Sequence, residues 1–293
     1  MYGFGYSTLV LNKTQTQSRS AASRAVLVTG GLVFAGSALW LVLSGNTGIR
    51  YSADHDGSVP MWVRWIPVAV GIALVRFVPA RPAPVTPHER RTVVEASALL
   101  AAAVLFAVVL AVAGGGEPAH TVSKLVLLLV VPVLLFRWSR GAGKTGVSAT
   151  GPWWTPVPAV AAWFAVSYAG PWALPMSDYA FTVDVLTLVA TLVVGFLVNS
   201  VLEEVFYRRW LQTRWEALLG RWPAIVLTSL LWAGWHVGIQ GTGDLPSDLA
   251  ATFVNQGVAG LFLGYLWSRH RLMWPVITVH GAMNAAPILL PLL

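Results

Sequence analysis

Long apolar runs dominate this sequence and decide what it can fold into. A helix that crosses the hydrocarbon core of a bilayer needs about 20 apolar residues. Nine segments come close to or exceed that length: 25–44, 61–78, 92–113, 120–136, 156–173, 182–207, 223–240, 249–267 and 273–291. The chain is 56% hydrophobic and 11% charged, whereas soluble domains carry roughly 25% charged residues. We therefore predict an all-α, polytopic transmembrane helix bundle of about eight to nine spans.

The N-terminal spans differ in how clearly they are marked. Segment 61–78 contains Arg64 and Arg76, and segment 120–136 is short, so these two are the weakest of the nine. The first apolar run begins at Ala25 and is about 20 residues long, which is too long for the h-region of a signal peptide. We expect an uncleaved first helix behind a flexible cytosolic N-terminal arm, residues 1–24.

Charged residues alternate in sign from one connection between spans to the next. Basic residues precede the first span and follow the second, fourth, sixth and eighth: Lys13, Arg19, Arg24, Arg81, Arg90, Arg91, Arg137, Arg140, Lys144, Arg208, Arg209, Arg214, Arg221, Arg269 and Arg271. The other connections hold Asp54, Asp56, Glu117, Asp178, Asp244 and Asp248, with Arg50 as the basic exception. Because basic loops stay on the cytosolic side, we predict a plasma-membrane protein with a cytosolic N-terminus and an external C-terminus.

Composition excludes two classes of function. The net charge of +7 comes from basic residues spread over several short loops, where they face anionic lipid headgroups. No single basic patch remains to bind nucleic acid. The chain has no cysteine, so it has neither a thiolate nucleophile nor a cysteine-type zinc site. The expected partners are the lipid bilayer and a membrane-associated or lipidated peptide.

The chain divides into a part without recognisable motifs and a part rich in them. A glycine- and proline-rich segment, 138–158, separates them. We predict a cytosolic arm (1–24), accessory transmembrane helices (25–150), a linker with one span (151–181) and a functional core (182–293). Gly260 and Gly264 form a GxxxG pair on the eighth span, which is more typical of a helix-packing face than of a ligand site.

Strongly polar residues inside spans are costly and are usually functional. In the C-terminal part these are Glu203 and Glu204 on the sixth span, His236 on the seventh, and His280 and Asn284 on the ninth. His280 and Asn284 are four residues apart and therefore share one helix face. The set spans three helices, and the N-terminal half has nothing comparable.

The two adjacent glutamates are predicted to play different parts. Glu204 lies four residues before Arg208, so an ion pair within the helix can neutralise it. Glu203 is rotated by about 100° from Glu204 and needs a polar partner elsewhere in a low-dielectric setting. His236, His280 and Asn284 are the available partners, and their convergence on Glu203 would make a hydrolytic site.

Each of these features also has a purely structural interpretation. Glu204 with Arg208 can be an ordinary ion pair at a helix end, and a single histidine within the membrane can serve only to bond two helices. Lys124 and Glu95 lie near span ends, where long polar side chains are expected to snorkel to the interface. The number of polar constellations in one half favours a site over these separate explanations.

The order and spacing of these motifs resemble a known family. Glu203-Glu204-Val-Phe-Tyr-Arg208, Trp232-Ala-Gly-Trp-His236 and His280-Gly-Ala-Met-Asn284 are similar to the motifs of the CPBP family. That family comprises CAAX prenyl proteases of the second type and bacteriocin-processing or self-immunity proteins, and is also called the abortive-infection family. The resemblance covers roughly residues 182–293. One departure is Trp232, where the family commonly has phenylalanine, and we expect little loss of function from it.

The resemblance implies an intramembrane endopeptidase. Carried over to this sequence, it implies that Glu203 and His236 activate the attacking water. It further implies that His280 and Asn284 stabilise the oxyanion, and that Glu204 and Arg208, with Trp232, support the site. We expect these residues to line a cavity that opens to the cytosolic side.

The sequence leaves alternatives for two questions: whether the protein needs a metal, and whether it is catalytic. Glu203, His236 and His280 are residue types that bind zinc, but the chain has no HExxH motif, so we favour a mechanism that requires no cofactor, with Zn²⁺ as the alternative. A Gly-x-Gly-Asp sequence at 241–244, a motif of aspartyl intramembrane proteases, falls in an acidic connection and lacks a second aspartate within a span. The alternative function is a non-catalytic membrane immunity, scaffold or transport protein.

Overall fold

The computed structural model describes residues 4–51, 57–78, 90–139 and 151–293, with the side chains of residues 4–19 left out. Most of the expected linker at 138–158 lies outside the described residues. Seven described helices are long and apolar enough to cross a membrane: Ser20–Leu43, Arg90–Ala113, Ala119–Trp138, Val185–Leu219, Arg221–Gln240, Leu245–His270 and Met273–Leu292. Two shorter helices occupy the remaining expected positions, 61–78 and 156–173. The prediction of a polytopic helical bundle is confirmed.

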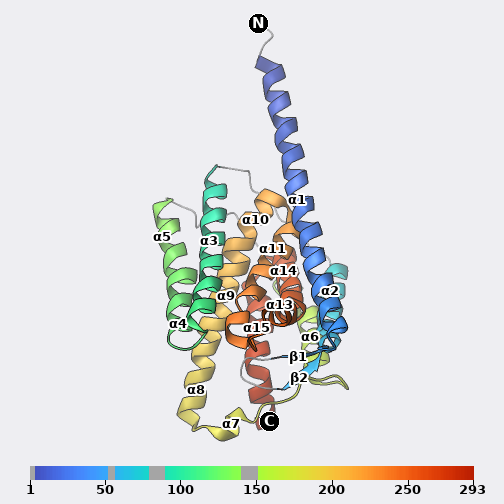
Figure 1. Cartoon of the computed structure of the whole chain (residues 1–293), viewed down its shortest axis with the longest axis vertical. Helices are drawn as coiled ribbons and strands as arrows, with labels where there is room; N and C mark the ends of the chain where they lie inside the picture. The colour runs from blue at the N-terminus through green and yellow to red at the C-terminus, as the bar shows by residue number, and fades with distance from the viewer. Residues whose placement is uncertain (1–3, 52–56, 79–89, 140–150) are drawn as a thin grey trace.

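The N-terminal half consists of rod-like helices and a small hairpin (Figure 1). Its elements are α1 (Phe4–Leu43), β1 (Gly48–Arg50), β2 (Ser58–Pro60), α2 (Met61–Phe77), α3 (Arg90–Ala113), α4 (Ala119–Lys124), the π-helical η1 (Leu125–Val130) and α5 (Val131–Trp138). The strands pair antiparallel with Ile49 opposite Val59. Helix α1 starts at Phe4, where the sequence analysis expected a flexible arm. Residues 4–24 contain no proline and one glycine, so nothing in them breaks the helix.

The C-terminal half carries the remaining elements. They are α6 (Val157–Tyr168), α7 (Tyr179–Thr182), α8 (Val185–Val194), the π-helical η3 (Gly195–Val201), α9 (Leu202–Glu204), the π-helical η4 (Val205–Gln212), α10 (Thr213–Leu219), α11 (Arg221–Gly234), α12 (Val237–Gln240), α13 (Leu245–Thr252), the π-helical η5 (Phe253–Gly257), α14 (Val258–His270), α15 (Met273–Leu289) and η6 (Leu290–Leu292). Elements α8 to α10 form one continuous helix, and so do α13 to α14.

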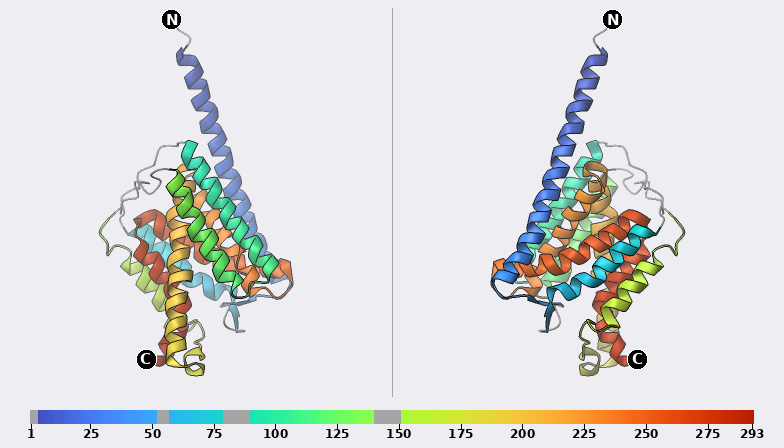
Figure 2. Two further views of the ribbon diagram at one scale, coloured as in Figure 1. Left: turned by 90° about the vertical axis from the view of Figure 1, so that its left-hand side faces the viewer. Right: turned by 90° about the vertical axis from the view of Figure 1, so that its right-hand side faces the viewer.

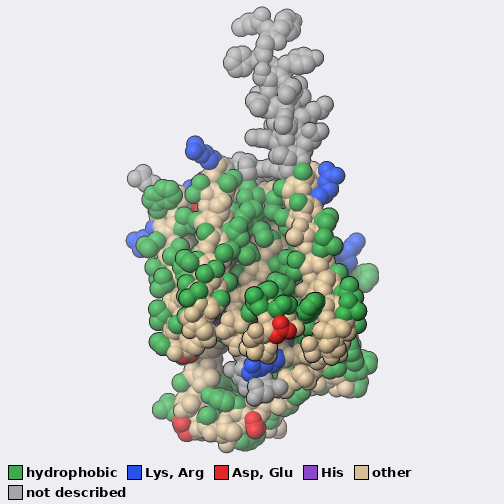
Figure 3. Space-filling view, viewed as in Figure 1, with side chains coloured by type: hydrophobic (Ala, Val, Ile, Leu, Met, Phe, Trp, Pro, Cys, Tyr) green, Lys and Arg blue, Asp and Glu red, His purple; other side chains and the backbone are tan. Residues whose placement is uncertain are grey.

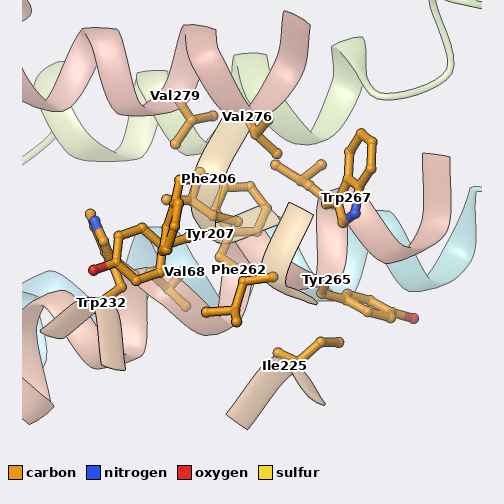
Figure 4. Packing of buried hydrophobic residues seen from close by; sticks show 14 of the residues in the cluster. Val68, Phe206, Tyr207, Ile225, Trp232, Phe262, Tyr265, Trp267, Val276 and Val279 are labelled. Atoms are coloured by element: carbon orange, nitrogen blue, oxygen red, sulfur yellow. The ribbon is translucent and has the colours of Figure 1, made fainter. Parts of the chain in front are cut away.

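The helix Leu245–His270 lies at the centre of the bundle. It is 72% buried, compared with 11% for Ser20–Leu43. A side chain on Gly260 would meet Ser229 at 2.9 Å, and one on Gly264 would meet Ile225 at 3.0 Å, so the absence of side chains lets α14 and α11 approach closely. The predicted packing role of this glycine pair is confirmed. Large side chains fill the adjoining core, including Phe206, Tyr207, Trp232, Phe262 and Trp267 (Figure 4).

The other helices surround this centre. Helix α3 packs along α4, η1 and α5 on one side of the bundle, and α1 packs against α11 and α13 on another (Figure 2). The two ends of the described chain lie at opposite ends of the molecule (Figure 1). In the space-filling view, basic side chains gather towards the end where α3 begins, and acidic side chains gather towards the other end, apart from one basic group there (Figure 3).

Candidate active site

The two glutamates lie in a distorted part of a long helix. Elements η3 and η4 are π-helical, and the three residues of α9, including Glu203 and Glu204, lie between them. Such π-helical turns are rare and occur often at functional sites. Glu203 and Glu204 are 1% and 0% exposed, so both carboxylates depend on partners within the protein.

Glu203 is held from two sides. The Lys124 ammonium lies 2.7 Å from its Oε1, and the Trp232 indole N–H donates to its Oε2 at 2.6 Å. The same ammonium donates to Asn199 Oδ1 at 2.8 Å and lies 4.6 Å from the centre of the Trp235 ring. Glu203 thus forms a fully buried ion pair with a lysine from the N-terminal half.

Glu204 faces a different set of partners. Arg208 Nε donates to its Oε2 at 3.1 Å, as expected from their spacing, and His280 Nδ1 lies 2.8 Å from its Oε1. A carboxylate only accepts hydrogen bonds, so His280 donates from Nδ1. Glu204 therefore joins the ninth span to the sixth and fixes which nitrogen of His280 faces away from it, a role that was not expected from the sequence.

His236 is oriented by its own helix. Its Nδ1 lies 2.9 Å from the carbonyl oxygen of Trp232. Because that oxygen can only accept, Nδ1 carries the proton and neutral His236 keeps Nε2 as an acceptor. The ring stacks on Trp235 with centroids 3.8 Å apart. The carbonyl and the indole together fix the ring in one plane and leave Nε2 as its chemically active atom.

Asn284 and Ser200 complete the polar contacts. Asn284 Nδ2 donates to Ser200 Oγ at 3.1 Å, which joins α15 to η3. His280 lies one helical turn earlier on α15, and its ring lies edge-on to Trp232 with centroids 5.2 Å apart. Gly281 lies beside His280 and lets Phe196 pack closely, since a side chain there would meet that ring at 3.2 Å.

A cavity of about 340 Å³ brings the predicted catalytic residues together. Glu203, His236, His280 and Asn284 all line it, and Trp232 lines it between the two histidines. Glu204 and Arg208 are not among its lining residues and lie behind it. The side chains that line the cavity are therefore distinct from Glu204 and Arg208, which hold them in place from behind.

Lys124 is a site residue that the sequence analysis missed. It was expected to snorkel to an interface, and this expectation is wrong, because its side chain is 0% exposed and ion-paired with Glu203. A lysine within a membrane span is expensive without a counter-charge. The sequence did contain a signal for this pair. It places a glutamate without a partner in one half and an isolated lysine within a span of the other, and the two could have been predicted to meet.

Glu95 corrects the same expectation at a second position. It is 4% exposed rather than snorkelling. Its carboxylate accepts from Arg214 Nε at 2.8 Å, from Arg91 Nε at 2.9 Å and from Ser139 Oγ at 2.9 Å. These contacts join α3 to α10 and to the end of α5, and so position the accessory helices against the helix that carries Glu203.

Trp232 contributes more than its aromatic ring. From the sequence, tryptophan here was expected to be a small departure from phenylalanine, with little loss of function. The indole N–H makes a hydrogen bond to Glu203 that phenylalanine has no group to make. The ring also lies 5.3 Å from the Arg208 guanidinium. Trp232 therefore contacts both the cavity-facing glutamate and the supporting arginine.

The side chains as arranged do not fit a zinc site. Among the described residues, no group of three or more histidines, aspartates or glutamates is placed to hold a metal ion. Of the three alternative ligands, Glu203 is already bound by an ammonium and an indole.

The cavity reaches the acidic end of the molecule. Its lining includes Tyr51 from the hairpin connection and Glu117 from the α3–α4 connection, and the Glu117 side chain is 62% exposed. The cavity was expected to open to the cytosolic side, which the sequence assigned to the basic connections, whereas its lining reaches a connection that carries an acidic residue. The motifs contain no information on how the accessory connections fold over the site.

A comparison with family models agrees with the position of the motifs. Residues 185–286 match the family described as type II CAAX prenyl endopeptidase Rce1-like. The match runs from the start of α8 into α15 and includes all three motifs, whereas Lys124 and Glu95 lie outside it. Neither a curated protein nor a solved structure matches the chain.

Proposed function

We propose that this chain, which belongs to the CPBP family, is an intramembrane endopeptidase whose catalytic residues are Glu203, His236, His280 and Asn284. The family to which the matched domain belongs is a protease family. The observation that carries the assignment of residues is that these four side chains, from three separate helices, line one cavity. The reaction is hydrolysis of a peptide bond in a membrane-associated substrate.

Water activation falls to Glu203 and His236. A carboxylate has about four lone-pair sites, so Glu203 can accept from a water while Lys124 and Trp232 keep their hydrogen bonds. His236 Nε2 is a second acceptor that faces the cavity and orients the same water. As the water oxygen attacks the carbonyl carbon, one proton passes to Glu203, which later delivers it to the departing amine nitrogen.

Oxyanion stabilisation falls to His280 and Asn284. The Asn284 amide is an N–H donor at the cavity and can turn from Ser200 to the developing negative charge. His280 donates from Nδ1 to Glu204, so it must be protonated on both nitrogens to donate from Nε2 as well. Donors aimed at an oxyanion contribute roughly 10²–10³-fold to the rate.

The proposed mechanism requires no metal. The poor fit of the donor set supports this, because Glu203 already has a cation as its partner. We expect proteolysis to survive removal of divalent ions. Activity of the purified protein should be measured after dialysis against a zinc chelator, with zinc added back. Loss of activity on chelation and recovery on zinc addition would contradict the metal-free mechanism.

The substrate is proposed to reach the site from the bilayer. Phe196 lines the cavity and is 44% exposed, so the proposed entry path passes an apolar ring. A lipidated or membrane-embedded peptide fits such a path, as in CAAX-like or bacteriocin-processing substrates. The cavity has to hold only the segment of the substrate around the scissile bond.

We retain the plasma-membrane orientation as part of the proposal, with a cytosolic N-terminus and an external C-terminus. The opposite ends of the chain and the separation of basic from acidic side chains support it. In this orientation, the acidic end that the cavity reaches is external. Reporter fusions after Leu293 and in segment 140–150 should show opposite sidedness, and equal sidedness would contradict the orientation.

The direct test replaces Glu203 with glutamine. The purified full-length protein should be incubated with a library of quenched fluorescent peptides, half of them farnesylated. We expect Glu203→Gln to lower cleavage by about 10²–10⁴-fold. Asp178→Asn makes the same carboxylate-to-amide change at an exposed position and should leave cleavage unchanged. Equal cleavage by Glu203→Gln and wild type would remove Glu203 as the base.

One observation favours the non-catalytic alternative. Both oxygens of Glu203 are already engaged, by Lys124 and Trp232. If the pair serves only to hold helices together, the protein acts as a membrane immunity, scaffold or transport protein. Under that alternative, no peptide in the library is cleaved, and Glu203→Gln alters stability alone.

A further inference from the structure

His120 carries a buried polar atom to which no role has been assigned. The residue lies on α4, in the N-terminal half and outside the family match. Its side chain is 12% exposed and lines the cavity. Nδ1 contacts Glu117 Oε1 at 3.0 Å, whereas Nε2 is buried and has no hydrogen-bond partner among the described side chains. Because buried polar atoms are normally hydrogen-bonded, this nitrogen needs a partner.

Glu117 decides which nitrogen of His120 carries the proton. It also accepts from the Thr121 hydroxyl at 3.0 Å. Burial raises the pKa of Glu117, but the hydrogen bonds from His120 and Thr121 outweigh it, so the pKa lies below its ordinary value. An ionised carboxylate only accepts, so His120 donates from Nδ1. A second cation next to the Lys124 ammonium is unfavourable, which favours neutral His120 with Nε2 as an acceptor.

Lys124 has a donor that matches this acceptor. An ammonium group carries three hydrogens that can be donated. Lys124 uses two of them, towards Glu203 at 2.7 Å and towards Asn199 at 2.8 Å. Among the described residues, none accepts the third hydrogen. Lys124 follows His120 by four residues, so the two side chains share one face of the helix.

Two aromatic rings lie beside both His120 and Lys124. The ring centre of Trp235 is 4.6 Å from the Lys124 ammonium and 5.7 Å from the centre of the His120 ring. The corresponding distances for Phe106 are 5.9 and 6.2 Å. The exposed fraction of the side chain falls from 62% at Glu117 to 12% at His120 and 0% at Lys124. The three residues therefore lead from the rim of the cavity to the buried ion pair.

We propose that His120 is a positioning residue whose Nε2 accepts the third hydrogen of the Lys124 ammonium, directly or across one bridging water. A water that bridges two polar groups is nearly as favourable as a direct hydrogen bond. Glu117, His120, Lys124 and Glu203 then form one chain of hydrogen bonds, which fixes the ammonium on the catalytic carboxylate. The proposal rests on the proposed function of Glu203 and adds a histidine from the N-terminal half to the site.

Two replacements of His120 separate the roles of its two nitrogens. His120→Asn keeps an amide near the position of Nδ1, where it can bond to Glu117, but has no acceptor at the position of Nε2. His120→Gln places its amide near the position of Nε2 and keeps an acceptor for Lys124. With the full-length protein and the quenched fluorescent peptides, we expect His120→Asn to lower cleavage roughly tenfold, since hydrogen bonds to charged groups are strong. His120→Gln should recover most of that loss.

Thr121→Val is the matched control. It removes a hydrogen bond to the same Glu117 carboxylate but leaves the chain from His120 to Glu203 intact, so its cleavage should match that of the wild type. A purely structural role of His120 through Glu117 predicts the reverse order of the two replacements. Cleavage by His120→Gln that is equal to or lower than that by His120→Asn would therefore overturn the proposal.

A second measurement follows the Lys124 ammonium and needs no turnover. The chain has three lysines, Lys13, Lys124 and Lys144. In a background of Lys13→Arg and Lys144→Arg, isotope-labelled lysine reports on Lys124 alone, and NMR in lipid nanodiscs can follow the exchange of its ammonium hydrogens with water. We expect this exchange to be roughly tenfold faster in His120→Asn and close to the wild-type rate in His120→Gln.

The two measurements separate this proposal from the proposed catalysis. Faster exchange in His120→Asn, in a protein that cleaves no peptide, would support the contact between His120 and Lys124 and remove the peptidase function. Exchange and cleavage that both remain normal in His120→Asn would overturn the contact and leave the proposed catalysis standing.

Discussion

The two halves of this molecule differ in how much their sequences reveal. Residues 182–293 contain three polar motifs on successive spans, and the family match lies within them. Residues 25–150 contain no motif that can be named. In the structure, however, the second half depends on the first, because Lys124 pairs with Glu203 and Glu95 pairs with Arg214. The proposed active site therefore depends on residues from both halves, although only the second half contains recognisable motifs.

The partner of a buried charge can come from a helix that is otherwise little buried. The helix from Ala119 to Trp138 is only 17% buried, and most of its surface faces outward. One fully buried side chain, Lys124, is nevertheless enough to make it part of the site. A charge that is enclosed in the membrane needs its opposite nearby, and the helix that supplies it need not share any motif with the core.

Of the variants that test this dependence, Lys124→Met is expected to have the largest effect. In Lys124→Met, Glu203 loses its counter-charge, so it takes up a proton or turns away and no longer accepts one from water. We expect peptide cleavage to fall by about 10²–10⁴-fold, as for loss of the base itself. Arg137→Met removes an exposed cation from the same helix and should retain cleavage. Normal activity of Lys124→Met would separate the two halves functionally.

Changing Glu204 tests the support within the C-terminal half. Glu204→Gln leaves the buried Arg208 without its carboxylate and weakens the contact that orients His280. Breaking a buried pair costs about 3–5 kcal/mol, so we expect a marked loss in the free energy of unfolding together with lower activity. Unfolding by SDS in mixed micelles measures the first quantity. A free energy of unfolding equal to that of the wild type would show that Glu204 does not stabilise the fold.

Trp232→Phe should have the smallest effect of the three. The variant restores the residue that is common in the family and keeps an aromatic ring between the histidines, but it removes the hydrogen bond to Glu203. A hydrogen bond to a charged acceptor contributes about 1.5–3 kcal/mol, so we expect roughly a 10-fold or larger loss of activity with little change in fold. The measurement is the rate of peptide cleavage. A rate equal to that of the wild type would show that activity needs the aromatic ring but not the hydrogen bond.

Parts of the fold and site followed directly from sequence. The positions of the spans follow from hydropathy alone, and the contact between Glu204 and Arg208 follows from their spacing within one helix. The close approach of α14 and α11 at Gly260 likewise follows from a local pattern. Each of these depends on residues that are neighbours along one helix, whose geometry is known in advance.

What could not be predicted depends on how separate helices meet. The pairing of Lys124 with Glu203 joins residues 79 apart in sequence, and no local pattern specifies it. The hydrogen bond from the Trp232 indole to Glu203 depends on the rotation of α11 relative to α9. The opening of the cavity depends on connections such as those at Tyr51 and Glu117, which lie outside every motif.

The most direct test of the shared site is a double-mutant cycle of Lys124→Met and Glu203→Gln. Free energies of unfolding should be measured for the wild type, both single variants and the double variant in mixed micelles. Because each single change leaves one buried charge unpaired, we expect Lys124→Met to cost roughly 3–5 kcal/mol. The double variant, which removes both charges, should regain part of that loss, with a coupling energy of about 1–3 kcal/mol. Losses that add to within about 0.5 kcal/mol would contradict the ion pair and, with it, the account of an active site completed by the N-terminal half.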